Sequence, residues 1–216
     1  MGVIVYIHVC QLGDWRRSFN MTMDRIRTSG LYSVATEFRC GVVSPTGAVT
    51  PDELFMDPKM KIICSGYSQE YERPTLLHMR NSAEIDGDET RYLYVHTKGL
   101  RWFGTPKEPF VVDWIKLLLY WNVNKWSDAL MRLDTHDTYG CNYYCKDSPW
   151  PPHYSGNFFW TKPSHLKTLP RHIGLGYNDP EFWLCLNRPL AFNAFASGLE
   201  GMGHYDTPFP ESIYAK

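Results

Sequence analysis

The sequence lacks a long apolar segment and lacks an excess of charge of either sign. No uninterrupted apolar run approaches the roughly 20 residues that cross a bilayer. Its 22 Lys and Arg residues against 23 Asp and Glu residues give a formal net charge of −1. Such a balance argues against attraction to nucleic acid or to an anionic membrane through bulk charge. We therefore expect no membrane span and no nucleic-acid partner.

Cysteine is sparse, and a secretion signal is not evident. The 6 cysteines are spread over 216 residues, and the opening segment has neither the basic flank nor the apolar length of a signal peptide. We therefore expect reduced thiols and a cytoplasmic location. No second Cys or His pair follows Cys141 and Cys145 at the spacing of a zinc finger, which argues against a structural zinc site.

Three nucleotide-binding or catalytic motifs are missing. The chain contains no GxxxxGK followed by Ser or Thr, no GxGxxG and no GxSxG. Their absence argues against a P-loop ATPase, a dinucleotide-dependent oxidoreductase and a hydrolase with a nucleophile elbow.

The composition is that of one globular domain with many aromatic rings. Hydrophobic residues make up 44% and charged residues 21% of the chain, and aromatic residues reach 15% with 8 Trp and 14 Tyr. The length suffices for one well-buried domain and is short for two, so we expect a single domain over residues 1–216. The rings suit a flat or hydroxylated ligand, although core packing explains them equally well.

Strand-like and helix-like segments alternate in the first half of the chain. We expect strands at Val3–Cys10, Phe38–Val43, Lys61–Cys64, Arg91–His96, Thr138–Tyr144 and His153–Thr161. We expect helices between Gly13 and Ser29 and at Glu70–Ala83, Phe110–Tyr120, Trp126–Leu133, Pro163–Leu169 and Pro180–Leu186, with a tail on the surface from Gly201. The pattern predicts an α/β, Rossmann-like domain whose central mixed, mostly parallel sheet is flanked by helices.

Polar residues follow three of the predicted strands. The first strand ends at residues 8–11, the third at residues 65–68 and the fourth at residues 96–99. Residues 96–99 are His-Thr-Lys-Gly. The carboxyl ends of parallel strands share one edge of a sheet, where ligands bind. The hydroxyl and ammonium groups of the fourth strand end would suit a phosphate. A strand leading into a solvated turn is the alternative.

A second unusual segment covers residues 153–160. Small Ser155 and Gly156 allow a ligand to approach the backbone, and Asn157 and Trp160 suit the hydroxyls and the apolar face of a sugar. The alternative is an ordinary core strand with a glycine kink.

Three segments together resemble a known family. Residues 92–99 (Tyr-Leu-Tyr-Val-His-Thr-Lys-Gly), 153–160 (His-Tyr-Ser-Gly-Asn-Phe-Phe-Trp) and 179–183 (Asp-Pro-Glu-Phe-Trp) resemble hallmark segments of glycosyltransferases with the GT-A fold. The chain is most similar to the N-terminal domains of large chlorella-virus glycosyltransferases linked to capsid glycans. This resemblance implies a UDP-sugar donor, a divalent cation such as Mn²⁺, a glycan or glycoprotein acceptor, a host-cell cytoplasmic location and further domains in a longer chain.

The resemblance also implies roles for individual residues. The uridine would lie between the first and third strand ends, and the diphosphate would lie near the following helix and the fourth strand end; the residues concerned are His8, Val9, Ser65, Tyr67, Arg80, Thr97 and Lys98. His-Thr-Lys stands where most GT-A enzymes have Asp-x-Asp. Either Lys98 neutralises the diphosphate itself, or His96 holds the metal with a distant ligand such as His204. Asp86-Gly87-Asp88 matches Asp-x-Asp but precedes its strand, so we expect it at the opposite edge of the sheet.

Sugar transfer with inversion needs a carboxylate base on the acceptor side, whereas a retaining enzyme can do without one by using a nucleophile or the leaving phosphate. Glu181 is the candidate catalytic group, with Asp179 behind it. Ordinary alternatives exist, because aspartate commonly caps helices and glutamate in a first turn interacts favourably with the helix dipole. Two other functions stay open: a carbohydrate-binding module without transfer, and a nucleotide-sugar hydrolase or nucleotide-binding domain that has lost transfer.

Overall fold

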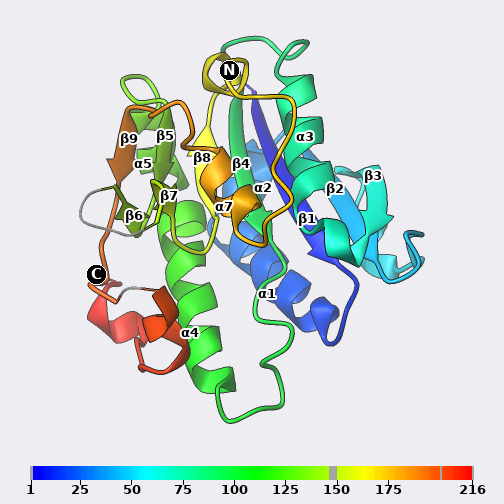
Figure 1. The fold of residues 1–216 in the computed structure, drawn as a ribbon, viewed down its shortest axis with the longest axis vertical. Coiled ribbons are helices and arrows are strands. Elements are labelled where there is room, and N and C mark those ends of the chain that lie inside the picture. Colours follow the sequence, from blue (N-terminus) through cyan, green and yellow to red (C-terminus); the bar gives the residue numbers. More distant parts are fainter. Residues whose placement is uncertain (1, 146–149, 200, 216) are drawn as a thin grey trace.

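A central sheet organises the computed structural model, which describes residues 2–145, 150–199 and 201–215. In this part of the chain seven strands pair in the order β3-β2-β1-β4-β8-β5-β9 (Figure 1). They are β1 (Val3–Cys10), β2 (Glu37–Ser44), β3 (Met60–Tyr67), β4 (Arg91–His96), β5 (Thr138–Gly140), β8 (Phe159–Thr161) and β9 (Ala191–Asn193). Strands β1 to β4 are parallel, and β8 runs antiparallel to β4 and β5. The predicted fold class is confirmed.

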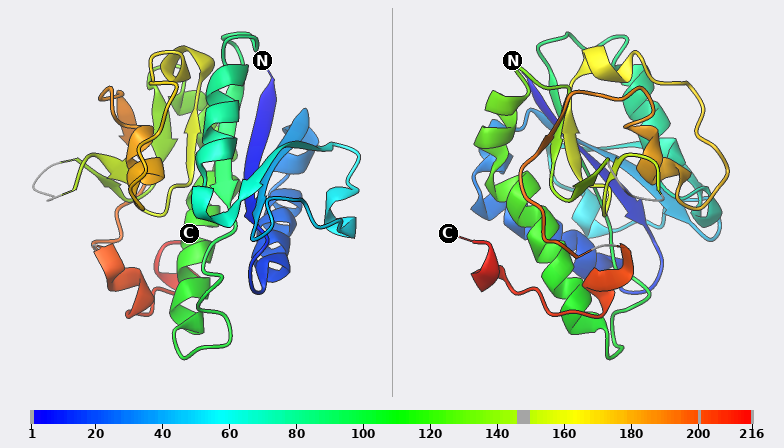
Figure 2. Two further views of the ribbon diagram at one scale, coloured as in Figure 1. Left: turned by 45° about the vertical axis from the view of Figure 1, so that its right-hand side comes forward. Right: turned by 60° about the vertical axis from the view of Figure 1, so that its left-hand side comes forward.

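Helices cover both faces of the sheet (Figures 1 and 2). The core against one face includes side chains of α1, α4 and α5, and the core against the other face includes those of α3, α6 and α7. The α-helices are α1 (Trp15–Thr28), α2 (Leu31–Val34), α3 (Arg73–Ser82), α4 (Glu108–Leu119), α5 (Trp126–Arg132), α6 (Pro163–Leu166) and α7 (Asp179–Trp183). Short helical turns are η1 (Glu53–Phe55), η2 (Ser68–Glu70), η3 (Tyr120–Asn124), η4 (Gly201–Tyr205) and η5 (Glu211–Ile213).

Alternation along β1 decides which side chains face which layer. Val5, Ile7 and Val9 belong to the core beneath α1 and α4, whereas Tyr6 belongs to the core beneath α3. His8 is two residues after Tyr6 and so lies on the same face of the strand, where its Nδ1 is 2.8 Å from Thr75 Oγ1 of α3. Because neighbouring side chains on a strand point to opposite faces, His8 and Val9 lie in different layers.

Two predicted strands are each divided into shorter pieces. Residues 153–161 form β7 (His153–Tyr154) and β8, separated by a turn in which Gly156 has φ 89° and Asn157 has φ 55°. A Cβ on Gly156 would lie 2.7 Å from a Leu118 methyl carbon, so glycine is required both for its φ and for its packing. Residues 138–144 likewise form β5 and β6 (Tyr143–Tyr144), and β6 pairs with β7 in a small second sheet. The prediction of continuous strands was wrong, because positive φ ends the extended backbone.

The tail is also more than a surface segment. Its turns η4 and η5 lie beside α4 (Figure 2). The His204 ring stacks on Trp114 of α4 with centroids 5.2 Å apart, and Tyr214 is buried in the core on that face. The tail therefore completes a layer of the fold, contrary to the prediction, because its aromatic rings bury apolar area against α4.

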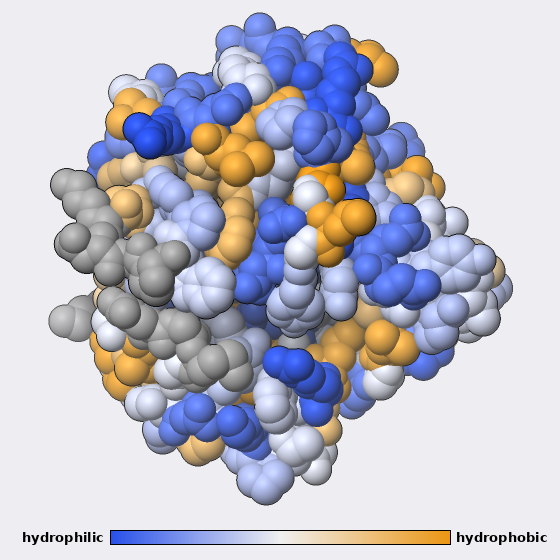
Figure 3. Space-filling model, in the orientation of Figure 1, coloured by the Kyte–Doolittle hydropathy of each residue, from blue (hydrophilic) through white to orange (hydrophobic). Residues whose placement is uncertain are grey.

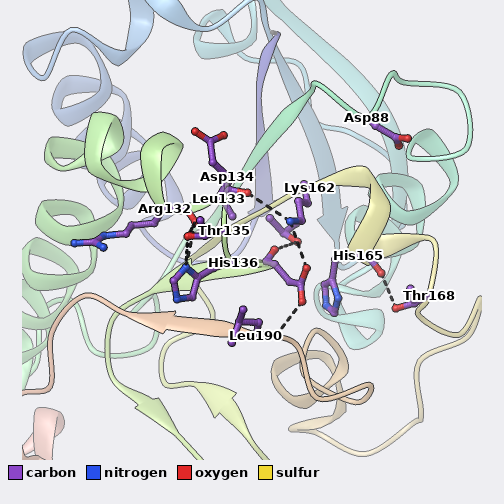
Figure 4. A network of polar contacts seen from close by, with 12 residues as sticks. Asp88, Arg132, Leu133, Asp134, Thr135, His136, Lys162, His165, Thr168 and Leu190 are labelled. Atoms are coloured by element: carbon purple, nitrogen blue, oxygen red, sulfur yellow. Dashed lines mark hydrogen bonds and ion pairs between the residues drawn. The ribbon is translucent and has the colours of Figure 1, made fainter.

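The amino edge of the sheet carries structural ion pairs. The network in Figure 4 joins the ends of β5, β8 and β9: Lys162 Nζ lies 3.4 Å from Asp137, and Leu190 N donates to Asp137 at 2.9 Å. At the same edge, before β4, Asp86 accepts hydrogen bonds from Tyr92 and Arg39. Residues 86–88 therefore lie at the amino edge of the sheet, opposite the carboxyl ends of β1 and β4, as predicted for this turn.

Candidate active site

A cavity of about 610 Å³ lies at the carboxyl ends of β1 and β4. Its volume is within the range of small-molecule sites. The walls come from the β1 end, the segment after β4, the start of α3, the β7–β8 turn and α7. In the space-filling view, hydrophilic side chains gather near the centre of the face seen in Figure 1, with apolar ones beside them (Figure 3).

The structure brings together six of the residues that the sequence singled out. Two strand ends, one turn and one helix supply them: His8, His96, Thr97, Lys98, Asn157 and Glu181 line the cavity. The principle that carboxyl ends of parallel strands meet at one edge predicted this convergence for the first and fourth strands. For the β7–β8 turn and α7, the convergence follows from the tertiary fold.

Backbone hydrogen bonds fix the segment after β4. Thr97 N donates to His8 O at 2.9 Å, and the Thr97 hydroxyl accepts from Cys10 N at 2.9 Å. Lys98 N donates to Ser18 Oγ of α1 at 2.9 Å. Thr97 therefore joins the two strand ends, and Lys98 leaves the sheet in a defined direction.

Lys98 presents an ammonium group to the cavity. Its Nζ lies 4.0 Å from the centroid of the Trp114 ring, at a distance typical of a cation–π contact. Among the described residues, Nζ of Lys98 has no hydrogen-bond or ion-pair partner. Burial lowers the pKa of Lys98 below its ordinary value, and the carboxylates of Glu181 and Glu72 oppose that shift. A bound anion would supply the partner that this cation lacks.

Glu72 is a cavity residue that the sequence reasoning missed. It precedes α3, and one of its carboxylate oxygens lies 3.8 Å from His96 Nε2. Burial alone would raise the pKa of Glu72, but His96, His8 and Lys98 lower it below the ordinary value. The signal was available in principle, because residue 72 lies in the loop after the third strand, where loops gather at the ligand edge.

Glu181 contacts the β7–β8 turn. Its Oε1 accepts a hydrogen bond from Gly156 N at 2.7 Å. Its other carboxylate oxygen has no hydrogen-bond partner in the described part of the chain. The carboxylate is near enough to Lys98 to oppose the burial shift in the pKa of that amine. One oxygen of Glu181 is thus held by the backbone, and the other is free to accept a proton or a hydroxyl.

Asn157 carries a buried amide without a partner. The residue is only 3% exposed, and among the described residues its buried Nδ2 has no hydrogen-bond acceptor. Trp102 and Trp114 also line the cavity, and their buried Nε1 atoms likewise find no acceptor in the described part of the chain. Buried polar groups normally find partners, so these three donors are exceptions within the residues that form the cavity wall.

Aromatic side chains form a rim at the cavity. Tyr71 and Tyr177 meet edge to face with centroids 5.2 Å apart, and the Phe182 ring lies 5.2 Å from His153 and 6.1 Å from Trp150. All five line the cavity. Rings of this kind bind the apolar faces of sugars and bases.

Three residues of β1 and β3 that were predicted to bind the nucleotide lie outside the cavity. The Val9 side chain is fully buried in the core on the α1 and α4 face, because strand alternation turns it away from His8. Ser65 and Tyr67 do not line the cavity. Strand β3 is the edge of the sheet, about 10 Å from β1 at ordinary strand spacing, and the later residues Ser68 and Tyr71 reach the cavity instead.

Arg80 and Asp179 have structural contacts outside the cavity. The Arg80 guanidinium donates to Leu169 O, Lys167 O and Glu84. It lies eight residues along α3 from Glu72, which is about 12 Å in a helix. The predicted cap at Asp179 was wrong: α7 begins at Asp179, which accepts from Gly176 N at 2.7 Å and so shapes the preceding loop.

Trp160 and His204 are also held by the fold. Trp160 is fully buried, and its Nε1 donates to Asn122 O at 2.7 Å. His204 does not line the cavity, and its Nε2 lies 2.9 Å from Ser197 Oγ. Burial lowers the pKa of His204 to about 4. The neighbouring Tyr205 does line the cavity, and no pattern in the tail indicated this.

The donor set of this cavity does not fit the expected Mn²⁺ ligands. Both ring nitrogens of His96 face carbonyl oxygens, with Nδ1 3.1 Å from Thr97 O and Nε2 3.0 Å from Gly156 O. A neutral imidazole donates from only one of its nitrogens, and a carbonyl oxygen already lies in front of the lone pair of the other, so a metal ion at that nitrogen would have to displace the carbonyl. In the described residues, no group of three His, Cys, Asp or Glu side chains is arranged to hold a metal ion.

Neither a protein-family model nor a curated protein sequence matches the chain. A crystal structure from Desulfovibrio desulfuricans G20, to which nucleotide-diphospho-sugar transferase activity has been provisionally assigned, is similar with a TM-score of 0.47 and 10% identity, over 91% of this chain and 81% of that one. The expected similarity to viral enzymes finds no support in these comparisons. Among the described residues, no helix has the length and apolar character to cross a membrane.

Proposed function

We propose that the protein is a glycosyltransferase that moves a sugar from a UDP-sugar to a hydroxyl of a glycan acceptor. One observation carries this proposal: the Lys98 ammonium and the Glu181 carboxylate face the same cavity at the carboxyl ends of β1 and β4. A cation and a carboxylate are the two groups that an inverting sugar transfer uses, one for the leaving diphosphate and one for the acceptor hydroxyl. The choice of UDP follows the family resemblance.

The proposed chemistry uses these two groups in one displacement. The acceptor oxygen forms a bond to the anomeric carbon, and the bond from that carbon to the β-phosphate oxygen breaks. The bonding electron pair stays on the phosphate, where Lys98 stabilises the added negative charge. The hydroxyl proton passes to the free oxygen of Glu181. UDP and the glycosylated acceptor are the products.

Thermal-shift measurements with UDP, GDP and CMP test donor binding. Ligand binding raises the melting temperature by mass action, so we expect UDP at millimolar concentration to raise it and CMP to have a smaller effect. The same measurement on short oligosaccharides tests the alternative of a carbohydrate-binding module, which the aromatic rim at Tyr71 and Tyr177 favours. If oligosaccharides stabilise the chain and no nucleotide does, the transferase proposal is wrong.

Replacement of Glu181 by Gln tests the proposed base. We expect Glu181→Gln to keep UDP affinity within about threefold and to lower sugar transfer by at least about 100-fold, because the amide still accepts from Gly156 N but takes up no proton. Glu89→Gln, in the exposed turn before β4, is the control and should transfer sugar normally. Loss of UDP affinity in Glu181→Gln would place this carboxylate on the donor side instead.

A further inference from the structure

Lys98 shares the cavity with two carboxylates. Glu181 and Glu72 both line the same wall, Glu181 from α7 and Glu72 from the residue before α3. Both carboxylates oppose the fall in the Lys98 pKa that burial causes. In an enzyme that binds a metal ion, carboxylates of this kind would hold that ion. In this protein the same cavity already contains a covalently attached cation.

The backbone around Lys98 is built to keep the ammonium in place. Its N–H is bound to Ser18 Oγ, and Trp114 lies beneath Nζ. The chain then turns at Gly99, which has φ 79° and where an added Cβ would clash with a Val111 methyl carbon. Only glycine permits this turn with α4 packed so closely, and the turn sends the chain onward along the cavity.

A second cation follows three residues later. Arg101 lines the cavity, is exposed, and stacks on Trp102 with its guanidinium carbon 4.8 Å from the ring centroid. It makes no ion pair with any residue that the structure describes. One guanidinium group can donate two parallel hydrogen bonds to phosphate oxygens, so Arg101 is chemically suited to bind a diphosphate beside Lys98.

From these contacts we infer that Lys98, with Arg101, neutralises the donor diphosphate directly and that donor binding requires no divalent cation. The inference rests on the proposed function and specifies how that site holds its donor. The poor fit of His96 and His204 to a metal supports it independently, since the ring nitrogens of His96 face carbonyl oxygens and His204 lies outside the cavity.

Calorimetric titration of UDP into the unmodified protein tests the inference without any variant. One titration contains EDTA and the other contains Mn²⁺, and we expect dissociation constants that agree within about threefold. Binding that appears only with Mn²⁺ would overturn the inference and leave the proposed function standing. Failure of UDP to bind under either condition would overturn the proposed function itself. The two failures are therefore distinguishable.

Variants then identify the cation. In EDTA we expect Lys98→Met to weaken UDP binding about 10- to 100-fold, which is the usual range for loss of a charged hydrogen bond. The exposed Arg101→Gln should weaken it about threefold to tenfold and carries little risk for folding. Lys107→Met is the matched control: Lys107 also lies over Trp102, at 5.1 Å, but is paired with Asp206 and does not line the cavity. UDP affinity unchanged in both Lys98→Met and Arg101→Gln would contradict the inference.

Discussion

The two sides of the cavity are built in different ways. On one side β1, β2 and β4 are parallel strands of six to eight residues, and their ladder hydrogen bonds place His8 and His96, after which Lys98 leaves the sheet. On the other side β7 and β8 have two and three residues, and side chains bound to loop backbone place Asn157 and Glu181. We call these the strand side and the loop side.

Because of this difference, we expect substitutions on the strand side to lower the stability of the whole domain and substitutions on the loop side to act more on function. Residues of the strand side belong to the buried sheet, so a change there affects the whole domain. The loop side depends on a few contacts such as those of Arg73, whose guanidinium donates to Gly174 O at 2.7 Å and to Gly176 O at 2.6 Å. Elements held by few contacts open locally at lower cost than core strands.

The largest expected effect comes from a core change on the strand side. Leu93 is fully buried in the middle of β4, and Leu93→Ala should lower the free energy of unfolding by about 2–5 kcal/mol. Urea unfolding measures this loss. Ile62→Ala on the edge strand β3, where the side chain is 46% exposed, should cost less than about 1 kcal/mol. Equal losses in the two variants would contradict the assignment of the sheet core.

A change on the loop side should have a smaller effect on stability and a selective effect on function. Arg73→Met removes hydrogen bonds that hold the loop before α7, and we expect a loss of about 1–3 kcal/mol in urea. Sugar transfer should fall at least about tenfold while UDP affinity changes less than about threefold, because Lys98 is untouched.

The control for this variant is an exposed arginine in an ion pair. Arg171 pairs with Glu84 at 2.7 Å, and its side chain is 67% exposed. Arg171→Met should change stability by less than about 0.5 kcal/mol, as exposed ion pairs usually do. If Arg73→Met weakens UDP binding as strongly as transfer, the two sides of the cavity do not act separately.

The last expected effect appears only in acid, and it is the response of the strand side to a fall in pH. Burial lowers the pKa of His8 to about 4, from an ordinary value of 6.5. Between these values the unfolded chain binds a proton at residue 8 that the folded chain does not, so stability falls as the pH falls from 6.5 to 4. His8→Gln should reduce that loss by up to about 3 kcal/mol. Urea unfolding at several pH values measures the slope, with His136→Gln on the surface as the control.

The strand side could be predicted because its signals are local. Short, dense runs of β-branched and aromatic residues identify β1 and β4, and a general rule places their carboxyl ends at one edge of the sheet. His8, His96, Thr97 and Lys98 were therefore correctly expected to lie together. Val9 was expected at the same place, but alternation along the strand turns its side chain into the core.

The loop side was only partly predictable because its residues are placed by distant contacts. Glu181 reaches the cavity through the Gly156 backbone, and Tyr205 reaches it through the packing of the tail against α4. The missed Glu72 was within reach of the strand-end rule, whereas Tyr205 had no local signal. Hydrogen bonds between residues far apart in sequence leave no periodic pattern that a single chain can show.

The sequence by itself determined the α/β class, the order of the early strands and helices, and the polar groups that end β1 and β4, because hydrophobic periodicity and short polar segments are local properties. The tertiary structure alone decided which faces and loops meet. It divided residues 153–161 at a turn with positive φ, brought Glu181 and Glu72 into the cavity that Lys98 lines, and directed the nitrogens of His96 toward backbone carbonyls. These features depend on close packing and on the pairing of buried backbone groups, and both involve residues that are far apart in the sequence.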